Sequence, residues 1–140
     1  MDQALAAATQ AAAQGEVPVG AVLVCGPQLF VDHNRTAHGE YPLRHAEMQV
    51  LTAATAVLTQ AEMRTATLFV TLEPCPMCMG AILHSHLGQL VFAASNLKWG
   101  CCGSVFDLRR EFPAESLQIT GGIREAEAAA LLSHFFEKRR

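Results

Sequence analysis

The chain has 140 residues, 51% of them hydrophobic and 16% charged, and a formal net charge of −3 at pH 7. This composition excludes a disordered chain, no apolar run reaches the ~20 residues of a membrane span, and we expect one globular domain over residues 1–140. The charge excludes a strong overall attraction to polyanions, so a nucleic acid would have to meet local basic patches such as residues 109–110 and 138–140.

The first third of the chain predicts a helix followed by a β-hairpin and a loop. Residues 2–14 are rich in Ala and Gln, which favour helix. Residues 19–24 form a continuous apolar run typical of a buried strand, and residues 29–33 are expected to pair back with it across a Gly-Pro turn. Residues 34–43 carry Asn, Gly and Pro and predict a loop.

The middle of the chain predicts two helices around a central strand. Apolar side chains recur at helical spacing over residues 44–58, which places the triplet His45-Ala46-Glu47 in the first turn of a helix. Residues 67–72 are β-branched, apolar and aromatic, as in a buried strand. The run Pro-Cys-Pro-Met-Cys at residues 74–78 then marks the start of a second helix, with its two cysteines one turn apart.

The last third predicts two more strands, at residues 89–93 and 117–120, and a final helix over residues 125–138. Strands that alternate with helices of this length indicate an α/β domain with three layers. No internal repeat, low-complexity linker or second domain is evident. The alanine-rich start has no basic region before its apolar residues, so it does not resemble a secretory signal, and we expect a cytoplasmic protein with no membrane partner.

Three side chains are candidate metal ligands: His45, Cys75 and Cys78. One imidazole and two thiolates can hold Zn²⁺ with a fourth position open, as in a catalytic site, whereas a structural site needs a fourth protein ligand. Alone, a histidine at a helix start is more often a cap, and a lone C-x-x-C is also typical of structural zinc or a redox pair. Their joint occurrence, with a proline before each cysteine, favours a zinc hydrolase.

Glu47 is the candidate proton shuttle. Zn²⁺ lowers the pKa of a bound water toward ~7, and a carboxylate two residues past the histidine is close enough to move protons without ligating the metal. An acidic residue in a first helical turn is otherwise a common response to the helix dipole. The order H-x-E…P-C-x-x-C is, however, the known signature of zinc nucleobase deaminases.

Two further features have several interpretations. Cys101 and Cys102 are adjacent, which makes a shared tetrahedral site awkward, so we expect free thiols. Trp99 is interpreted as a stacking surface for a base, an interface residue or a core anchor. The sequence favours none of these three roles for Trp99.

The chain resembles the bacterial tRNA-specific adenosine deaminases of the TadA type, within the cytidine deaminase-like superfamily. The His-Ala-Glu and Pro-Cys-x-x-Cys motifs specify the superfamily, and the similarity extends over nearly the whole length. The segments that carry it are residues 16–24 (EVPVGAVLV), 45–47 (HAE), 71–78 (TLEPCPMC), 103–104 (GS) and 130–140 (ALLSHFFEKRR).

The resemblance implies a three-layer α/β/α sandwich around a central mixed five-stranded sheet. It also implies one Zn²⁺ per chain held by His45, Cys75 and Cys78, with Glu47 as proton shuttle. The reaction expected is conversion of adenosine to inosine at the tRNA anticodon wobble position, by a homodimer. In such a site Asn34 hydrogen-bonds the flipped base, and the Ala46 backbone N–H and Glu47 orient it.

Two departures from the family pattern concern the substrate. Arg44 precedes the metal histidine where relatives usually have Ala, and this added cation would contact a phosphate or select a different substrate. Asn96 replaces the usual Asp of a loop that retains Lys98 and Gly100, and an amide recognises different groups from a carboxylate.

Two alternatives remain beside tRNA deamination, and the departures motivate the first of them. One is a deaminase of a free nucleobase, nucleoside or related aminated heterocycle, for instance guanine or cytosine. The other is a non-catalytic zinc module that assists an active partner, although the presence of Glu47 argues against it.

Overall fold

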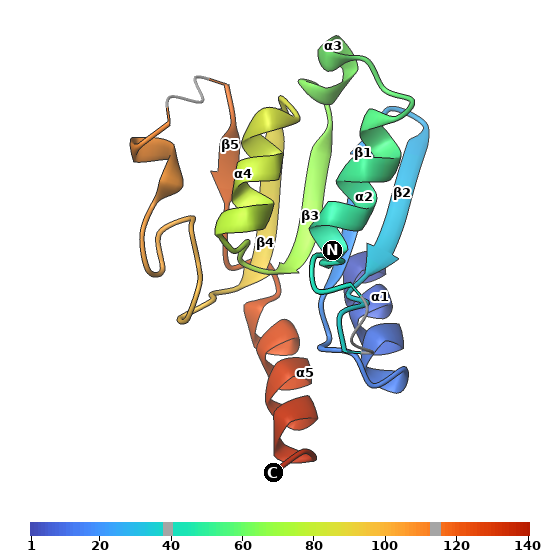
Figure 1. Ribbon diagram of the computed structural model, residues 1–140, viewed down its shortest axis with the longest axis vertical. Coiled ribbons are helices and arrows are strands. Elements are labelled where there is room, and N and C mark those ends of the chain that lie inside the picture. The colour runs from blue at the N-terminus through green and yellow to red at the C-terminus, as the bar shows by residue number, and fades with distance from the viewer. Residues whose placement is uncertain (38–40, 113–115) are drawn as a thin grey trace.

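The computed structural model describes residues 1–37, 41–112 and 116–140 (Figure 1). Part of the loop predicted over residues 34–43 therefore lies outside the described residues. The elements in chain order are α1 (Asp2–Ala13), β1 (Gly20–Cys25), β2 (Gln28–His33), α2 (Ala46–Thr55), α3 (Gln60–Met63), β3 (Thr67–Leu72), α4 (Pro76–His84), β4 (Gln89–Ala94), the 3-10 turn η1 (Leu108–Arg110), β5 (Gln118–Thr120) and α5 (Glu125–Glu137).

The five strands form one mixed sheet in the order β2-β1-β3-β4-β5. β1 pairs antiparallel with β2 and with β3, whereas β3, β4 and β5 run parallel. The parallel half arises because α4 carries the chain back from the end of β3 to the start of β4, as a crossover helix does. This arrangement confirms the α/β fold with a central mixed five-stranded sheet.

Helices cover both faces of the sheet. α2 and α4 lie in front of it in Figure 1, while α1 and α5 contact each other on the other side. The larger core lies under α2 and α4, where Leu23, Leu68 and Leu90 of three neighbouring strands are fully buried. A smaller core joins Leu5 of α1 to Ala128 of α5. The predicted three layers are confirmed.

Gly20 lets α1 approach the sheet closely. A Cβ built at Gly20 would lie 2.1 Å from the carbonyl oxygen of Ala4 and 2.6 Å from the backbone nitrogen of Ala8. Backbone atoms cannot move aside as a flexible side chain can, so only glycine is compatible with this contact. The alanines on the buried side of α1 serve the same close packing, since Ala4, Ala8 and Ala11 are fully buried.

The central strand gives the first testable prediction. Leu23→Ala is expected to lower the free energy of unfolding by about 2–5 kcal/mol, because the Leu23 side chain is fully buried and its removal leaves a cavity. Denaturant unfolding at constant zinc concentration measures this change. Leu29→Ala on β2 is the control, because Leu29 is 50% exposed and its truncation is expected to change stability by about 0.5 kcal/mol or less. Equal effects of the two variants would contradict the assigned core.

The structure also differs from the sequence prediction at two elements. The helix expected over residues 44–58 spans only Ala46–Thr55, and the short helix α3 follows it. A capping box starts α3, in which the Thr59 hydroxyl accepts from the Glu62 N–H while the Glu62 carboxylate accepts from the Thr59 N–H. This Thr-x-x-Glu signal was available in the sequence. No helix of the described residues is long and apolar enough to span a membrane.

Candidate metal centre and active site

The three candidate metal ligands come from the N-terminal ends of two helices. His45 is the N-cap residue of α2 and Cys75 is the N-cap residue of α4, each in extended conformation, and Cys78 lies in the first turn of α4. Pro76 occupies the first position of α4, where its missing N–H leaves no hydrogen bond unmade. The positive ends of both helix dipoles therefore point toward one place, which stabilises thiolates there.

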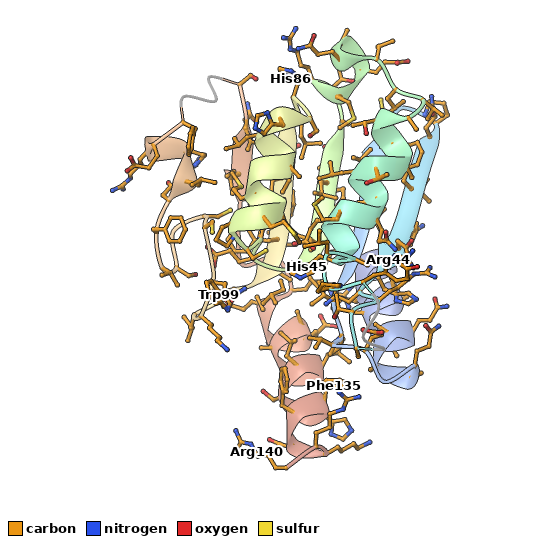
Figure 2. The ribbon with its side chains drawn as sticks, viewed as in Figure 1. Arg44, His45, His86, Trp99, Phe135 and Arg140 are labelled. Carbon is orange, nitrogen blue, oxygen red and sulfur yellow. The ribbon has the colours of Figure 1, made fainter. Side chains whose placement is uncertain are left out.

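The ligand atoms converge at short range. His45 Nδ1 lies 3.4 Å from Cys78 Sγ and 3.7 Å from Cys75 Sγ, and all three ligand atoms are within 4.8 Å of one another. In the described part of the chain this group contains these three side chains only. Figure 2 shows His45 near the middle of the molecule, at the end of the sheet where α2 begins. The sequence prediction that these residues lie together is confirmed.

The donor set is compatible with a zinc ion. Tetrahedral bonding with Zn–S of about 2.3 Å and Zn–N of about 2.0–2.1 Å separates a nitrogen ligand from a sulfur ligand by about 3.5 Å. The two measured N···S distances, 3.4 and 3.7 Å, lie on either side of that value. One imidazole and two thiols are also the ligand types that zinc prefers over Mg²⁺ or Ca²⁺. Three protein ligands leave one position for water or substrate.

The thiols of the cluster are strongly coupled. A hydrogen bond from Cys78, assisted by His45, lowers the pKa of Cys75 to about 4. The same hydrogen bond, burial and the nearby Glu47 raise the pKa of Cys78 above the ordinary thiol value. A hydrogen bond to Cys75 raises the pKa of His45. The lowered pKa of Cys75 favours the thiolate, the form in which cysteine binds a metal.

Glu47 lies in the first turn of α2 and is 4% exposed. Burial raises the pKa of Glu47 to about 7, in opposition to its own backbone N–H and to His45. A carboxyl group whose pKa lies near neutrality can both accept and donate a proton at physiological pH, which is the requirement for a general acid and base. Glu47 is not a member of the ligand group.

Asn34 and Ala46, two of the predicted substrate contacts, are bonded to each other. The Asn34 side-chain oxygen Oδ1 accepts from the Ala46 N–H at 2.9 Å, and both residues are buried. This bond ties the end of β2 to the first residue of α2, immediately after the candidate metal ligand His45. The geometry thus assigns Asn34 a structural partner that the sequence did not predict, while its contact with a base stays a prediction.

Arg44 lies at the exposed edge of the site. Its guanidinium carbon is 3.6 Å from the centre of the Tyr41 ring, which is a cation–π contact between two exposed residues. The stack fixes the side chain locally without neutralising its charge, so the guanidinium N–H groups remain able to bind an anion. Whether Arg44 contacts substrate stays a prediction.

Asn96 begins a loop, residues 96–106, here called the rim loop. Its side-chain oxygen accepts from the backbone N–H groups of Lys98 and Trp99 at 3.2 and 3.0 Å, and its amide nitrogen donates to the Glu73 carbonyl at 3.4 Å. A carboxylate at position 96 would make the first two bonds but not the third. A substrate contact for Asn96 stays a prediction, and the structure shows that this side chain orders its own loop.

Glu73 is the site residue that sequence reasoning missed. It is 1% exposed and accepts hydrogen bonds from three backbone N–H groups of the rim loop. Burial alone would raise the pKa of Glu73, but hydrogen bonds from Ser104, Asn96 and Cys102 outweigh it and lower the pKa below its usual value. The only sequence signal was a charged residue directly after a buried strand.

The adjacent cysteines Cys101 and Cys102 are not members of the ligand group. Cys101 and Cys102 are free thiols, as predicted, and burial raises their pKa values to about 11 and about 12, which makes both poor nucleophiles.

A cavity of about 600 Å³ lies at the other end of α4, lined by Arg64, His84 and His86 among others. Figure 2 shows His86 near the top of the molecule and His45 near its middle, and no residue of the ligand group lines this cavity, so the cavity is not part of the candidate metal centre.

Comparisons with known proteins agree with the geometry. Residues 1–140 match the family model of MafB19-like deaminases. The chain is 38% identical to the tRNA-specific adenosine deaminase of Bacillus subtilis, and the match covers 100% of this chain and 88% of that protein. It is 43% identical to the tRNA(Ile)-lysidine synthase of Deinococcus deserti, but it spans only 27% of the length of that protein.

Solved structures give the same result for the fold. A structure from a study of A-to-I editing by tRNA:A34 deaminases at the wobble position has a TM-score of 0.82 and 34% identity, covering 94% of this chain and 97% of that one. A guanine deaminase from Nitrosomonas europaea has a TM-score of 0.76 at 23% identity, covering 96% of this chain and 81% of that one. The second likeness concerns the fold alone.

Proposed function

The chain belongs to the MafB19-like deaminase family, and within it we propose that the chain is a zinc-dependent hydrolase that converts adenosine to inosine at the wobble position of a tRNA anticodon. The observation that carries the proposal is the cluster of His45, Cys75 and Cys78 with the buried carboxyl group of Glu47 beside it. The identity to tRNA-specific adenosine deaminases over the whole chain supports the substrate.

In this proposal three side chains would hold the metal ion, and a fourth, Glu47, transfers the protons. A Zn²⁺ ion held by His45, Cys75 and Cys78 would supply a Lewis acid that brings the pKa of a bound water toward ~7. The Glu47 carboxylate accepts a proton from the attacking water and delivers one to a ring nitrogen of the base, then carries a proton to the leaving amine. A carbon–oxygen bond forms and the carbon–nitrogen bond breaks, so that one water is consumed and one ammonia is released.

The residues around the cluster orient the base. Asn34 holds the first N–H of α2 with its side-chain oxygen, so its amide N–H groups are the donors that we assign to the base. Ala46 and Glu47 are the other residues that we assign to orienting the base. An unpaired anticodon loop suits such a site, because a base there can be turned out at modest cost.

The proposal includes a homodimer and a basic contact for RNA. We expect sedimentation or light scattering of the zinc-loaded protein to give twice the 15.1 kDa mass of the chain. Because the net charge is −3, contact with phosphates is assigned to local cations, with Arg44 at the edge of the site as the first candidate. A monomer at micromolar concentration would contradict the dimer while leaving the deamination chemistry intact.

The test of function is deamination of a defined RNA. The zinc-loaded protein is expected to raise the mass of a wobble-adenosine anticodon stem-loop by about one dalton, as exchange of an amine for a carbonyl requires. Mass spectrometry of the digested RNA measures the change, and a stem-loop with guanosine at that position is the control. Ammonia released from free adenine, guanine, cytosine or their nucleosides, without inosine in any RNA, would instead establish the free-base alternative that Arg44 and Asn96 motivate.

A further inference from the structure

The buried carboxylate of Glu73 connects the metal-site segment to the rim loop. Its Oε1 atom accepts from the N–H groups of Cys102 and Ser104 at 2.8 and 3.1 Å, and its Oε2 atom accepts from the N–H of Asn96 at 3.0 Å. Glu73 itself lies between the end of β3 and the ligand Cys75. One side chain therefore holds both ends of a loop that is distant in sequence.

Two further contacts press the rim loop against the same segment. The Cys101 N–H donates to the Pro74 carbonyl at 3.1 Å, directly beside the ligand Cys75. A Cβ at Gly100 would lie 2.4 Å from the Glu73 Oε2 atom, so a side chain at position 100 would occupy the space of the carboxylate. The glutamate at position 73 can therefore keep this place only if position 100 is glycine.

The rim loop carries apolar side chains that the chain leaves uncovered. Leu97 is 84% exposed, Trp99 is 56% exposed, and Val105 and Phe106 are 50% and 41% exposed. Figure 2 shows Trp99 at the same end of the sheet as His45. Exposed aromatic side chains beside a site that takes a turned-out base are suited to stack on the neighbouring unpaired bases, and Lys98 adds a cation for the phosphates. The core-anchor interpretation of Trp99 is wrong, because the side chain is exposed.

We propose that Glu73 is a positioning residue for substrate recognition, which holds the rim loop so that Trp99 stacks on a nucleotide flanking the target base. This inference rests on the proposed function, because it assigns the loop to an RNA substrate. Glu73 does not touch the reacting atoms in this role. Its contribution is to fix the loop before binding, so that the substrate does not have to order it.

A carboxylate is needed because all three loop donors are backbone N–H groups. The two oxygens of Glu73 accept three hydrogen bonds, and a glutamine at this position has only one oxygen acceptor. The amide NH₂ of a glutamine would face an N–H group on one side, so either the Asn96 end or the Cys102–Ser104 end of the loop would be released. Glu73→Gln therefore tests the hydrogen bonds with almost no change in volume.

The experiment compares zinc-loaded wild type with Glu73→Gln. Hydrogen exchange at the amides of Asn96, Cys102 and Ser104 measures the loop, and fluorescence quenching of Trp99, the single tryptophan, reports the same loop independently. Glu73→Gln is expected to speed exchange at these amides about tenfold or more and to raise KM for the stem-loop about tenfold, the change that corresponds to loss of one charge-assisted hydrogen bond. Zinc content and kcat stay near wild type.

Four further variants make the result specific. Glu62→Gln removes a carboxylate that accepts the Thr59 N–H at 2.7 Å on α3, and no change in KM is expected. Trp99→Ala is expected to raise KM while the three loop amides remain protected from hydrogen exchange. Trp99→Phe is expected to keep KM near the wild-type value, since phenylalanine keeps a ring to stack. Gly100→Ala is expected to reproduce the Glu73→Gln phenotype through the other partner of the same contact.

The outcomes separate the inference from the proposed function. If hydrogen exchange at the three loop amides stays as slow in Glu73→Gln as in wild type, the positioning role is overturned. If exchange becomes faster but KM is unchanged, the role of the loop in substrate recognition is overturned. An unchanged KM in Trp99→Ala would overturn the stacking. Absence of RNA deamination by the wild type overturns the proposed function instead, and this result is obtained from the wild type alone.

Discussion

Replacement of Glu47 by glutamine is expected to slow deamination by about 10²–10⁴-fold while zinc stays bound. Glu47 is buried next to the ligand cluster but is not one of the three ligands, so its loss removes proton transfer and leaves the metal-binding atoms in place. Glutamine keeps the shape of the side chain but cannot carry the proton. Single-turnover rates on the anticodon stem-loop and zinc analysis of the purified protein measure the two effects.

Glu62→Gln is the control for Glu47→Gln, because Glu62 is an exposed glutamate in the capping box of α3. We expect the Glu62 variant to retain the wild-type rate. A Glu47→Gln protein within tenfold of the wild-type rate would show that another group moves the protons. A Glu47→Gln protein without zinc would show that this side chain supports the ligand cluster itself.

Replacement of Cys78 by alanine is expected to remove zinc and activity together. Cys78 is fully buried, and its sulfur is 3.4 Å from His45 Nδ1. Without Cys78 only His45 and Cys75 remain as ligands, because the group has no fourth member among the described residues. Loss of a direct ligand is expected to weaken zinc binding by more than the roughly 10–100-fold that loss of an outer partner costs. Competition with a chromogenic chelator measures the affinity, and the thermal unfolding midpoint is expected to fall with it.

Cys25→Ala is the matched control for Cys78→Ala. Cys25 is also a buried free thiol, but it lies at the end of β1 and contacts Glu62 and Thr65 instead of the cluster. This variant is expected to retain full zinc content and activity. Zinc retained by Cys78→Ala at wild-type affinity would contradict the assigned ligand set.

The residues of the candidate site were predictable because their spacing is local. His45, Glu47, Cys75 and Cys78 lie at the starts of two helices whose apolar periodicity and prolines are visible in the sequence, and the hairpin and central strands follow from continuous apolar runs. The three layers were expected from the alternation of strands with helices, and the mixed five-stranded sheet from the family resemblance; both are confirmed. Boundaries were less accurate, as the shortened α2 and the added α3 show.

The contacts between distant segments were not predictable in the same way. Glu73 has its hydrogen bonds only because residues 96–104 fold back onto it. The spacing of residues in the sequence does not indicate that three backbone N–H groups donate to one carboxylate. Asn96 illustrates the same limit, because the comparison with the family pattern suggested a ligand-facing amide, whereas in the fold the oxygen of that amide accepts from two backbone N–H groups of its own loop.

The bond between Asn34 and Ala46 also bears on how such a scaffold acquires new specificities. Together with the bond from the Arg35 N–H to the Arg44 carbonyl at 3.0 Å, it closes the base of the segment between β2 and α2. Lengthening a segment whose ends are already joined costs little chain entropy, since each doubling adds only about 0.6 kcal/mol. Changes of length within the segment that these two bonds enclose are therefore expected to cost little, apart from Thr36 and Ala37, whose N–H groups donate to the buried Glu16 carboxylate, while the residues that the two bonds join stay in place.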